Sequence, residues 1–278
     1  RGPKGTEVKM VMLRKGQPAP IEFKVIRDKI PINSIDAYFM ASNEVGYIKL
    51  DRFAQTTMDE FQTAIAELKI KGMKHLILDL RGNSGGYLNT AIQLSDEFLE
   101  QNKLIVYTEG AYSPKQTYNS TEKGNFEKGR LIILIDEGSA SASEIVSGAI
   151  QDWDRGIILG RRSFGKGLVQ KPYNLYDGSL IRLTTSRYHT PTGRCIQKPY
   201  EEGVDEYYND LLNRMKHSEM ISADSIKFPD SLKYITPKGR VVYGGGGIMP
   251  DIFVPMDTNK TSYYYSKLAR AGMFNQYT

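Results

Sequence analysis

Three short apolar runs separated by segments of helical periodicity constrain the fold of this chain more than any other feature. The runs lie at residues 76–80, 131–135 and 156–160, and turn residues such as glycine bound them. Such short apolar runs are typical of strands covered on both faces of a parallel sheet. Between the runs, apolar residues such as Phe61 and Leu68 recur at helical spacing. Strands that alternate with helices predict an α/β core.

The segments on either side of this core have a different pattern. Near the N-terminus, residues 7–13 and 21–26 alternate between apolar and polar side chains around the turn Lys15-Gly16-Gln17-Pro18, which predicts a β-hairpin. After Lys166 the chain becomes rich in strand-forming residues, and we expect strands at 168–173 and 179–188. The core is therefore predicted to continue into a β-rich portion.

Two further segments lie towards the C-terminus. Residues 200–230 carry eight acids against three bases and show helical spacing, so we interpret them as an acidic surface insertion. Residues 261–273 predict a terminal helix.

Composition excludes several classes of protein. The 278 residues are enough for about two domains. Lys plus Arg exceeds Asp plus Glu by 37 to 32, a net charge of +5 that does not indicate a dedicated nucleic-acid binder. No apolar run reaches the roughly 18 residues of a membrane span, and Cys195 is the single cysteine, which excludes an internal disulfide. The chain begins Arg1-Gly2-Pro3 without Met, so we expect a removed leader or a fragment.

The turn Gly138–Glu144, between a buried strand and a helix, is the first candidate for chemistry. A serine at this place, such as Ser141, lies beside the unpaired N–H groups of a helix N-terminus, which can stabilise an oxyanion. The simpler interpretation of the turn alone is helix capping by Ser141 and Ser143. The glycine-rich turn at 82–86 could likewise bind an anion or be only a tight turn.

A nucleophilic serine needs a base, and the three histidines give little support for one. His217 lies in the acidic insertion, and His75 precedes a buried strand, where it would mark the strand edge. His189 is the one credible base among them. The alternative is Lys166, which lies between two glycines, because a desolvated lysine can be neutral near pH 7 and accept a proton.

Taken together, these residues resemble the C-terminal processing (tail-specific) serine proteases. The match rests on Gly138–Ile145, on Phe164–Gly167, and on spacing: Lys166 follows Ser141 by 25 positions, and Gln170 follows Lys166 by four. Further matching segments lie in the same order as in the family, at 79–86, 187–194 and 244–251. The resemblance covers residues 45–255. His189 departs from it, since the family often has an aromatic residue there, and residues 200–230 exceed the usual connection.

The resemblance implies a serine endopeptidase with a Ser–Lys dyad and an acyl-enzyme intermediate. Ser141 would be the nucleophile, Lys166 the general base and Gln170 the residue that orients the lysine. The N–H of Ala142, with that of Gly85 or Gly86, would form the oxyanion hole. No metal or organic cofactor is needed. The alternatives are a non-catalytic binding protein of the same fold, a crotonase-like protein that holds an acyl ligand at the glycine turn, or a scaffold that acts through the N-terminal segment.

The same resemblance implies a domain organisation, a substrate class and a cellular location. Residues 1–30 would be the C-terminal part of a PDZ domain, 31–256 a crotonase-like ββα protease core, and 257–278 a helical tail. Substrates would be proteins or peptides with unstructured C-termini, and not nucleic acid. The expected location is the bacterial cell envelope, in the periplasm, with membrane association only through segments outside this sequence. The sequence leaves open whether the protein works with an adaptor or as a homo-oligomer.

Overall fold

The computed structural model describes residues 2–28, 32–121, 124–200, 203–226, 228–258 and 262–274. The chain divides into two compact units, Arg1–Asn33 and Ser34–Thr278. The smaller unit is an antiparallel hairpin of β1 (Glu7–Met12) and β2 (Ile21–Ile26). This confirms the predicted hairpin, whereas its assignment to a PDZ domain stays a prediction.

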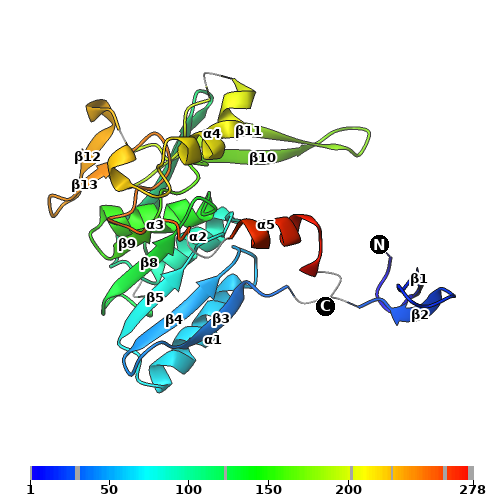
Figure 1. Ribbon diagram of the computed structural model, residues 1–278. Helices are drawn as coiled ribbons and strands as arrows, with labels where there is room; N and C mark the ends of the chain where they lie inside the picture. The colour runs from blue at the N-terminus through cyan, green and yellow to red at the C-terminus, as the bar shows by residue number, and fades with distance from the viewer. Residues whose placement is uncertain are drawn as a thin grey trace. The chain divides into compact units, whose positions relative to one another are not determined.

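The larger unit is built on a six-stranded sheet with the order β14-β9-β8-β5-β4-β3 (Figure 1). Only β3 runs antiparallel to its neighbour, and the other pairs are parallel. The strands are β3 (Ile35–Met40), β4 (Val45–Leu50), β5 (His75–Asp79), β8 (Leu131–Ile135), β9 (Ile157–Gly160) and β14 (Ile252–Phe253). The α/β fold and its strands at the three apolar runs are thus as predicted.

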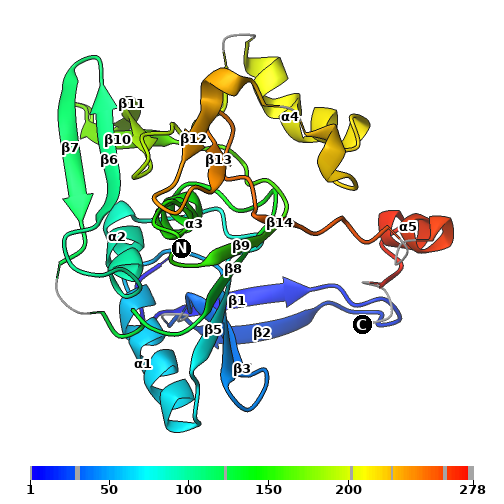
Figure 2. The same ribbon diagram turned by 90° about the vertical axis from the view of Figure 1, so that its left-hand side faces the viewer.

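Three helices pack their apolar residues against this sheet (Figure 2). They are α1 (Thr57–Ile70), α2 (Leu88–Asp96) and α3 (Ala142–Asp152). Leu76 and Leu78 of β5 are buried in the shared core, but Ile77 between them is only half-buried, and β8 alternates in the same way. The strands were expected to be covered on both faces, whereas one face is buried and the other is only half-buried at these positions.

A second sheet of four antiparallel strands has the order β10-β11-β6-β7. Its members are β6 (Leu104–Gly110), β7 (Ser113–Asn119), β10 (Leu168–Asn174) and β11 (Leu180–His189). The sequence predicted β10 and β11 but not β6 and β7. Their alternation is weak, since most of β7 is polar and exposed, and β6 buries the adjacent residues Ile105 and Val106. Figure 1 shows β10 and β11 as a long paired ribbon.

The remaining elements follow β11. They are α4 (Val204–Lys216), the short 3-10 helices η1 (Ala223–Ser225) and η2 (Asp230–Leu232), the two-stranded sheet of β12 (Lys233–Ile235) and β13 (Val241–Tyr243), and α5 (Tyr263–Arg270). Helix α4 confirms the helical spacing in the acidic insertion, and α5 falls within the predicted terminal helix. None of the helices in the described residues has the length and apolar character needed to cross a membrane.

Candidate active site

The turn before α3 holds Ser141 in an unusual backbone conformation. Its φ is 55° and its ψ is −110°, outside the regions that L-residues ordinarily occupy. Gly85 lies against it: a Cβ at Gly85 would come within 2.8 Å of the Ser141 Cβ. The 82–86 turn and the 138–143 turn, which were predicted separately, therefore meet at Ser141. Such strained backbone clusters at active sites, where the surrounding structure maintains it.

Two unpaired backbone donors flank this serine. Ala142 is the first residue of α3, and neither its N–H nor that of Gly86 finds a hydrogen-bond acceptor within the described parts of the chain. The N–H of Gly85, in contrast, donates to Asn83 Oδ1 at 2.9 Å. Unpaired N–H groups beside a nucleophile are the kind of donor that stabilises an oxyanion.

Glu144, in the first turn of α3, connects Ser141 to the Lys166 segment. Its Oε2 accepts the N–H of Ser141 at 2.7 Å and that of Lys166 at 2.9 Å. Its Oε1 accepts the Ser163 hydroxyl and the Gly165 N–H, both at 2.6 Å. The backbone nitrogens of Ser141 and Lys166 therefore lie no farther apart than the sum of these two hydrogen-bond distances. Burial raises the pKa of the Glu144 carboxyl, while the four donors oppose this by favouring its charged form.

Further hydrogen bonds fix the same segments. The Phe164 N–H donates to the Ser139 carbonyl at 2.9 Å, and the Ser163 hydroxyl accepts the Ile248 N–H at 2.6 Å. Asp136 Oδ1 accepts the N–H groups of Gly82 and Gly138 at 2.8 and 3.0 Å. These contacts hold both turns and the Lys166 segment in one arrangement, as positioning of catalytic groups requires.

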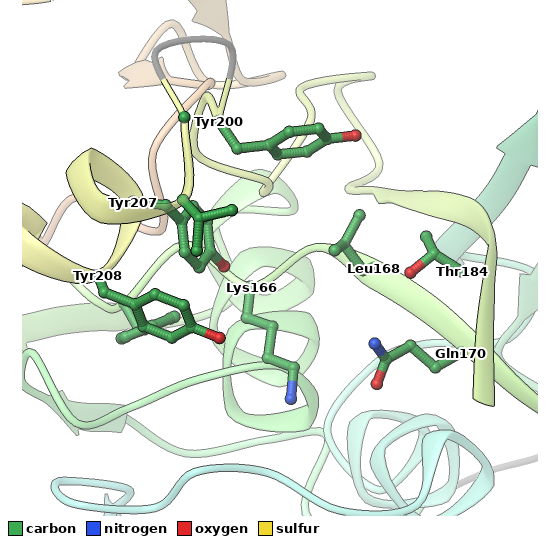
Figure 3. A pocket seen from close by; sticks show the side chains of 10 residues that line it. Lys166, Leu168, Gln170, Thr184, Tyr200, Tyr207 and Tyr208 are labelled. Atoms are coloured by element: carbon green, nitrogen blue, oxygen red, sulfur yellow. The ribbon is translucent and has the colours of Figure 1, made fainter. Parts of the chain in front are cut away.

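Lys166 and Gln170 line one cavity together (Figure 3). Lys166 is half-buried and Gln170 is exposed. The pairing of β10 with β11 shifts register between Val169 and Gln170. A bulge of this kind redirects a side chain. Figure 3 shows the Gln170 amide and the Lys166 side chain entering the same part of the cavity.

None of the three histidines lines this cavity. His75 Nδ1 accepts the Arg130 N–H at 3.1 Å, and His217 is exposed at the end of α4. His189 stacks on Tyr107 with ring centroids 4.7 Å apart, and its Nδ1 lies 3.2 Å from the Gly193 carbonyl. His189, the alternative base, thus makes structural contacts with Tyr107 and Gly193.

Sequence reasoning missed several residues that shape the site. Arg194 and Asp152 form a fully buried ion pair at 2.7 Å, which holds the end of α3 to the 187–194 segment. Arg214 of α4 donates to the Ser163 and Phe164 carbonyls at 2.8 and 3.3 Å. Both arginines stand among mixed polar and apolar residues in the sequence, so no local signal could name partners that lie about 40 to 50 positions away.

The described residues contain no group of three or more His, Cys, Asp or Glu side chains that could hold a metal ion. The candidate site consists of hydroxyl, amine, amide, carboxyl and backbone groups. A serine hydroxyl beside free N–H donors is an arrangement that can carry out acyl transfer if a base accepts its proton, and the backbone of Lys166 is held to that of Ser141 through Glu144.

Comparison with known proteins gives the family. The sequence model of peptidase family S41 matches residues 44–207. This chain belongs to peptidase family S41. It is 38% identical over 202 residues to the carboxy-terminal-processing protease of Bartonella bacilliformis, an alignment covering 71% of this chain and 46% of the relative. It is 35% identical over 198 residues to the carboxy-terminal processing protease CtpA of Bacillus subtilis, covering 71% of this chain and 42% of the relative. The chain spans less than half of these relatives.

Solved structures agree on the fold. The photosystem II D1 C-terminal processing protease superposes with a TM-score of 0.59 at 23% identity, over 96% of this chain and 60% of that one. A putative S41 protease from Bacteroides fragilis gives a TM-score of 0.56 at 15% identity, over 98% of this chain and 66% of that one. Both show that this chain shares their α/β fold.

Proposed function

We propose that this protein is a serine endopeptidase that cleaves polypeptides near their C-termini through Ser141 and Lys166. The observation that carries the proposal is the shared bond to Glu144, because one carboxylate oxygen accepts the N–H of both residues. Membership of the S41 family and relatives named as carboxy-terminal processing proteases support it.

In the proposed reaction, unprotonated Lys166 takes the proton from Ser141 Oγ as this oxygen attacks the peptide carbonyl. The negative charge that develops on the carbonyl oxygen would be met by the N–H groups of Ala142 and Gly86. We choose Gly86 over Gly85 because the Gly85 N–H already donates to Asn83. Lys166 then gives its proton to the leaving amine, and a water molecule hydrolyses the acyl-enzyme. Gln170 would orient the lysine side chain.

The substrates and setting follow from the same family. We propose proteins or peptides with unstructured C-termini as substrates and the bacterial cell envelope as the location. The bacterial relatives named as C-terminal processing proteases support the substrate class. Fractionation of the source cells would test the location, and a cytoplasmic protein would contradict it.

The test of the activity uses a folded protein with an unstructured tail and intact-mass analysis of the products. Wild-type protein should shorten the tail, and Ser141→Ala should leave it intact. Ser139→Ala and Ser143→Ala are matched controls in the same turn, since their hydroxyls donate to the carbonyls of Leu80 and Asn83. Cleavage by Ser141→Ala would contradict the assignment. Tail binding without cleavage by the wild type would favour a non-catalytic binding protein.

A further inference from the structure

The cavity that Lys166 enters is lined mainly by aromatic and aliphatic side chains (Figure 3). Its volume is about 600 Å³, and Lys166 is its one charged lining residue among the described residues. Its apolar lining consists of Phe164, Leu168, Tyr200, Val204, Tyr207 and Tyr208. Cavities that bind apolar groups have this composition, with a few polar groups that fix orientation. We call these six residues the aromatic pocket.

The back wall of the aromatic pocket is rigidly packed. The rings of Phe164 and Tyr207 meet edge to face with centroids 6.3 Å apart. Lys198 Nζ lies 4.2 Å from both centroids and donates to the Tyr207 carbonyl at 3.0 Å. A buried cation held between two rings fixes their positions.

Helix α4 supplies the outer wall and is anchored to the Lys166 segment. Arg214 is buried and donates to the Ser163 carbonyl at 2.8 Å, while Asp210 accepts Arg214 Nη2 at 3.1 Å and Lys198 Nζ at 3.0 Å. The helix is therefore an integral wall of the site, although its sequence suggested a solvated insertion. The match to the S41 family model ends at Tyr207, so most of α4 lies beyond it.

The mouth of the pocket leaves apolar surface in contact with solvent. Tyr208 is 76% exposed and Val204 is 69% exposed, both on the part of α4 that lines the cavity. Figure 3 shows the Tyr208 ring on one side of the Lys166 amine and Gln170 on the other. An apolar group that entered between them would lie directly beside the proposed base and bury this surface.

We propose that the aromatic pocket is a specificity subsite for one large apolar or aromatic side chain of the polypeptide, next to the bond that is cleaved. The inference rests on the proposed function, since Lys166 places the pocket beside the reacting atoms. Apolar contact in a pocket of this kind changes specificity by about 10- to 200-fold. Tyr208 and Val204 would therefore determine which residue beside the scissile bond is preferred.

Unstructured peptides that differ only at the residues flanking the cleaved bond test this. Wild-type protein should cleave a Phe or Leu peptide with a kcat/KM at least about tenfold above that of the Ala and Lys peptides. Tyr208→Asp and Val204→Asp should each lower the Phe/Ala ratio by about tenfold and raise the Lys/Phe ratio. The matched control is Leu212→Asp, an exposed α4 position outside the cavity lining, which should keep the wild-type ratios.

Two outcomes separate this inference from the proposed function. If the wild type cleaves and Ser141→Ala does not, but the pocket variants keep the wild-type Phe/Ala ratio, the pocket proposal is overturned alone. If neither the wild type nor any variant cleaves, the same peptides are labelled with a fluorophore, and their binding to Ser141→Ala is measured by fluorescence anisotropy. The pocket is supported if Ser141→Ala binds the Phe peptide more tightly than the Ala and Lys peptides. This preference should be lost when Tyr208→Asp is added and kept when Leu212→Asp is added. Equal binding of the Phe, Ala and Lys peptides overturns it.

Discussion

The segment 162–167 is held from two sides, and the two sides use opposite chemistry. On the α3 side, Glu144 is an acceptor for the N–H groups of Gly165 and Lys166. On the α4 side, Arg214 is a donor to the carbonyls of Ser163 and Phe164. A loop has few regular partners for its backbone groups, and each buried group that stays unpaired is costly. One buried carboxyl group and one buried guanidinium group together supply those partners.

The two sides differ in what else they hold. Glu144 also accepts the Ser141 N–H, so the α3 side ties the proposed nucleophile to the proposed base. Arg214 reaches no residue of the 138–144 turn in the described hydrogen bonds, and instead fixes α4 and the aromatic pocket. We therefore expect damage on the α3 side to affect the chemical step and damage on the α4 side to affect mainly substrate preference.

The largest effect should come from the side chain that both sides position. Lys166→Arg keeps the positive charge but cannot lose a proton near neutral pH, so it should be as inactive as Lys166→Ala. Loss of a general base lowers the rate by at least about a hundredfold. Peptide cleavage rates measure this, with thermal unfolding as a check of folding. An active Lys166→Arg would show that the amine acts only as a charge.

The second-largest loss of activity is expected for Glu144→Gln, because this change removes the carboxyl oxygen that accepts the N–H groups of both Ser141 and Lys166. The amide can offer one oxygen, so donors now facing its NH₂ group lose their partner, at about 1–3 kcal/mol for each buried group. We expect a lower free energy of unfolding and a fall in kcat, measured by denaturant titration and by kinetics on the Phe peptide. Glu219→Gln is the control, since Glu219 binds Arg162 near the surface of the α4 side. Equal kcat in the two variants would contradict the assigned difference.

Arg214→Met tests the other side and should act differently. It leaves the Ser163 and Phe164 carbonyls without their buried donor and frees α4, which should lower stability by about 3–5 kcal/mol, as when one partner of a buried pair is lost. Residual activity should show a reduced preference for Phe over Ala peptides, and its kcat should fall less than in Glu144→Gln. A fall in kcat as deep as that of Glu144→Gln, with the preference unchanged, would remove the distinction between the sides.

The sequence predicted the parts of the fold that depend on local pattern. The strands at 76–80, 131–135 and 156–160 follow from their apolar runs and helix α1 from its helical spacing, because burial in the core imposes both patterns. Strands β6 and β7 were not predicted, since β7 is mostly polar and β6 buries the adjacent residues Ile105 and Val106, so neither alternates regularly. The helical spacing in 200–230 was recognised, but its acidic composition suggested a solvated surface.

The candidate site was predictable only as separate motifs. Ser141, Lys166 and Gln170 were named through motif and spacing, whereas Glu144 was named as the end of the turn that begins at Gly138. Three of its four hydrogen bonds depend on where residues 19 to 22 positions later return to α3. The partners of Arg214 are likewise set by tertiary packing. Sequence identifies which residues can react, whereas the structure identifies which residues hold them in place.

The smallest effect should come from a residue that belongs to neither side. His189 stacks on Tyr107 and lies against the Gly193 carbonyl, so His189→Ala should cost about 0.5–1.5 kcal/mol of stability from the lost ring contact. Activity should fall by less than about tenfold, against at least a hundredfold for a lost base. His189→Phe keeps a ring for Tyr107 but has no basic nitrogen, so it should recover the stability while remaining active. Thermal unfolding and peptide cleavage of the two variants measure both effects. If both lost activity while His189→Phe kept wild-type stability, a histidine would be the base, and Lys166 would be only a neighbour of the nucleophile.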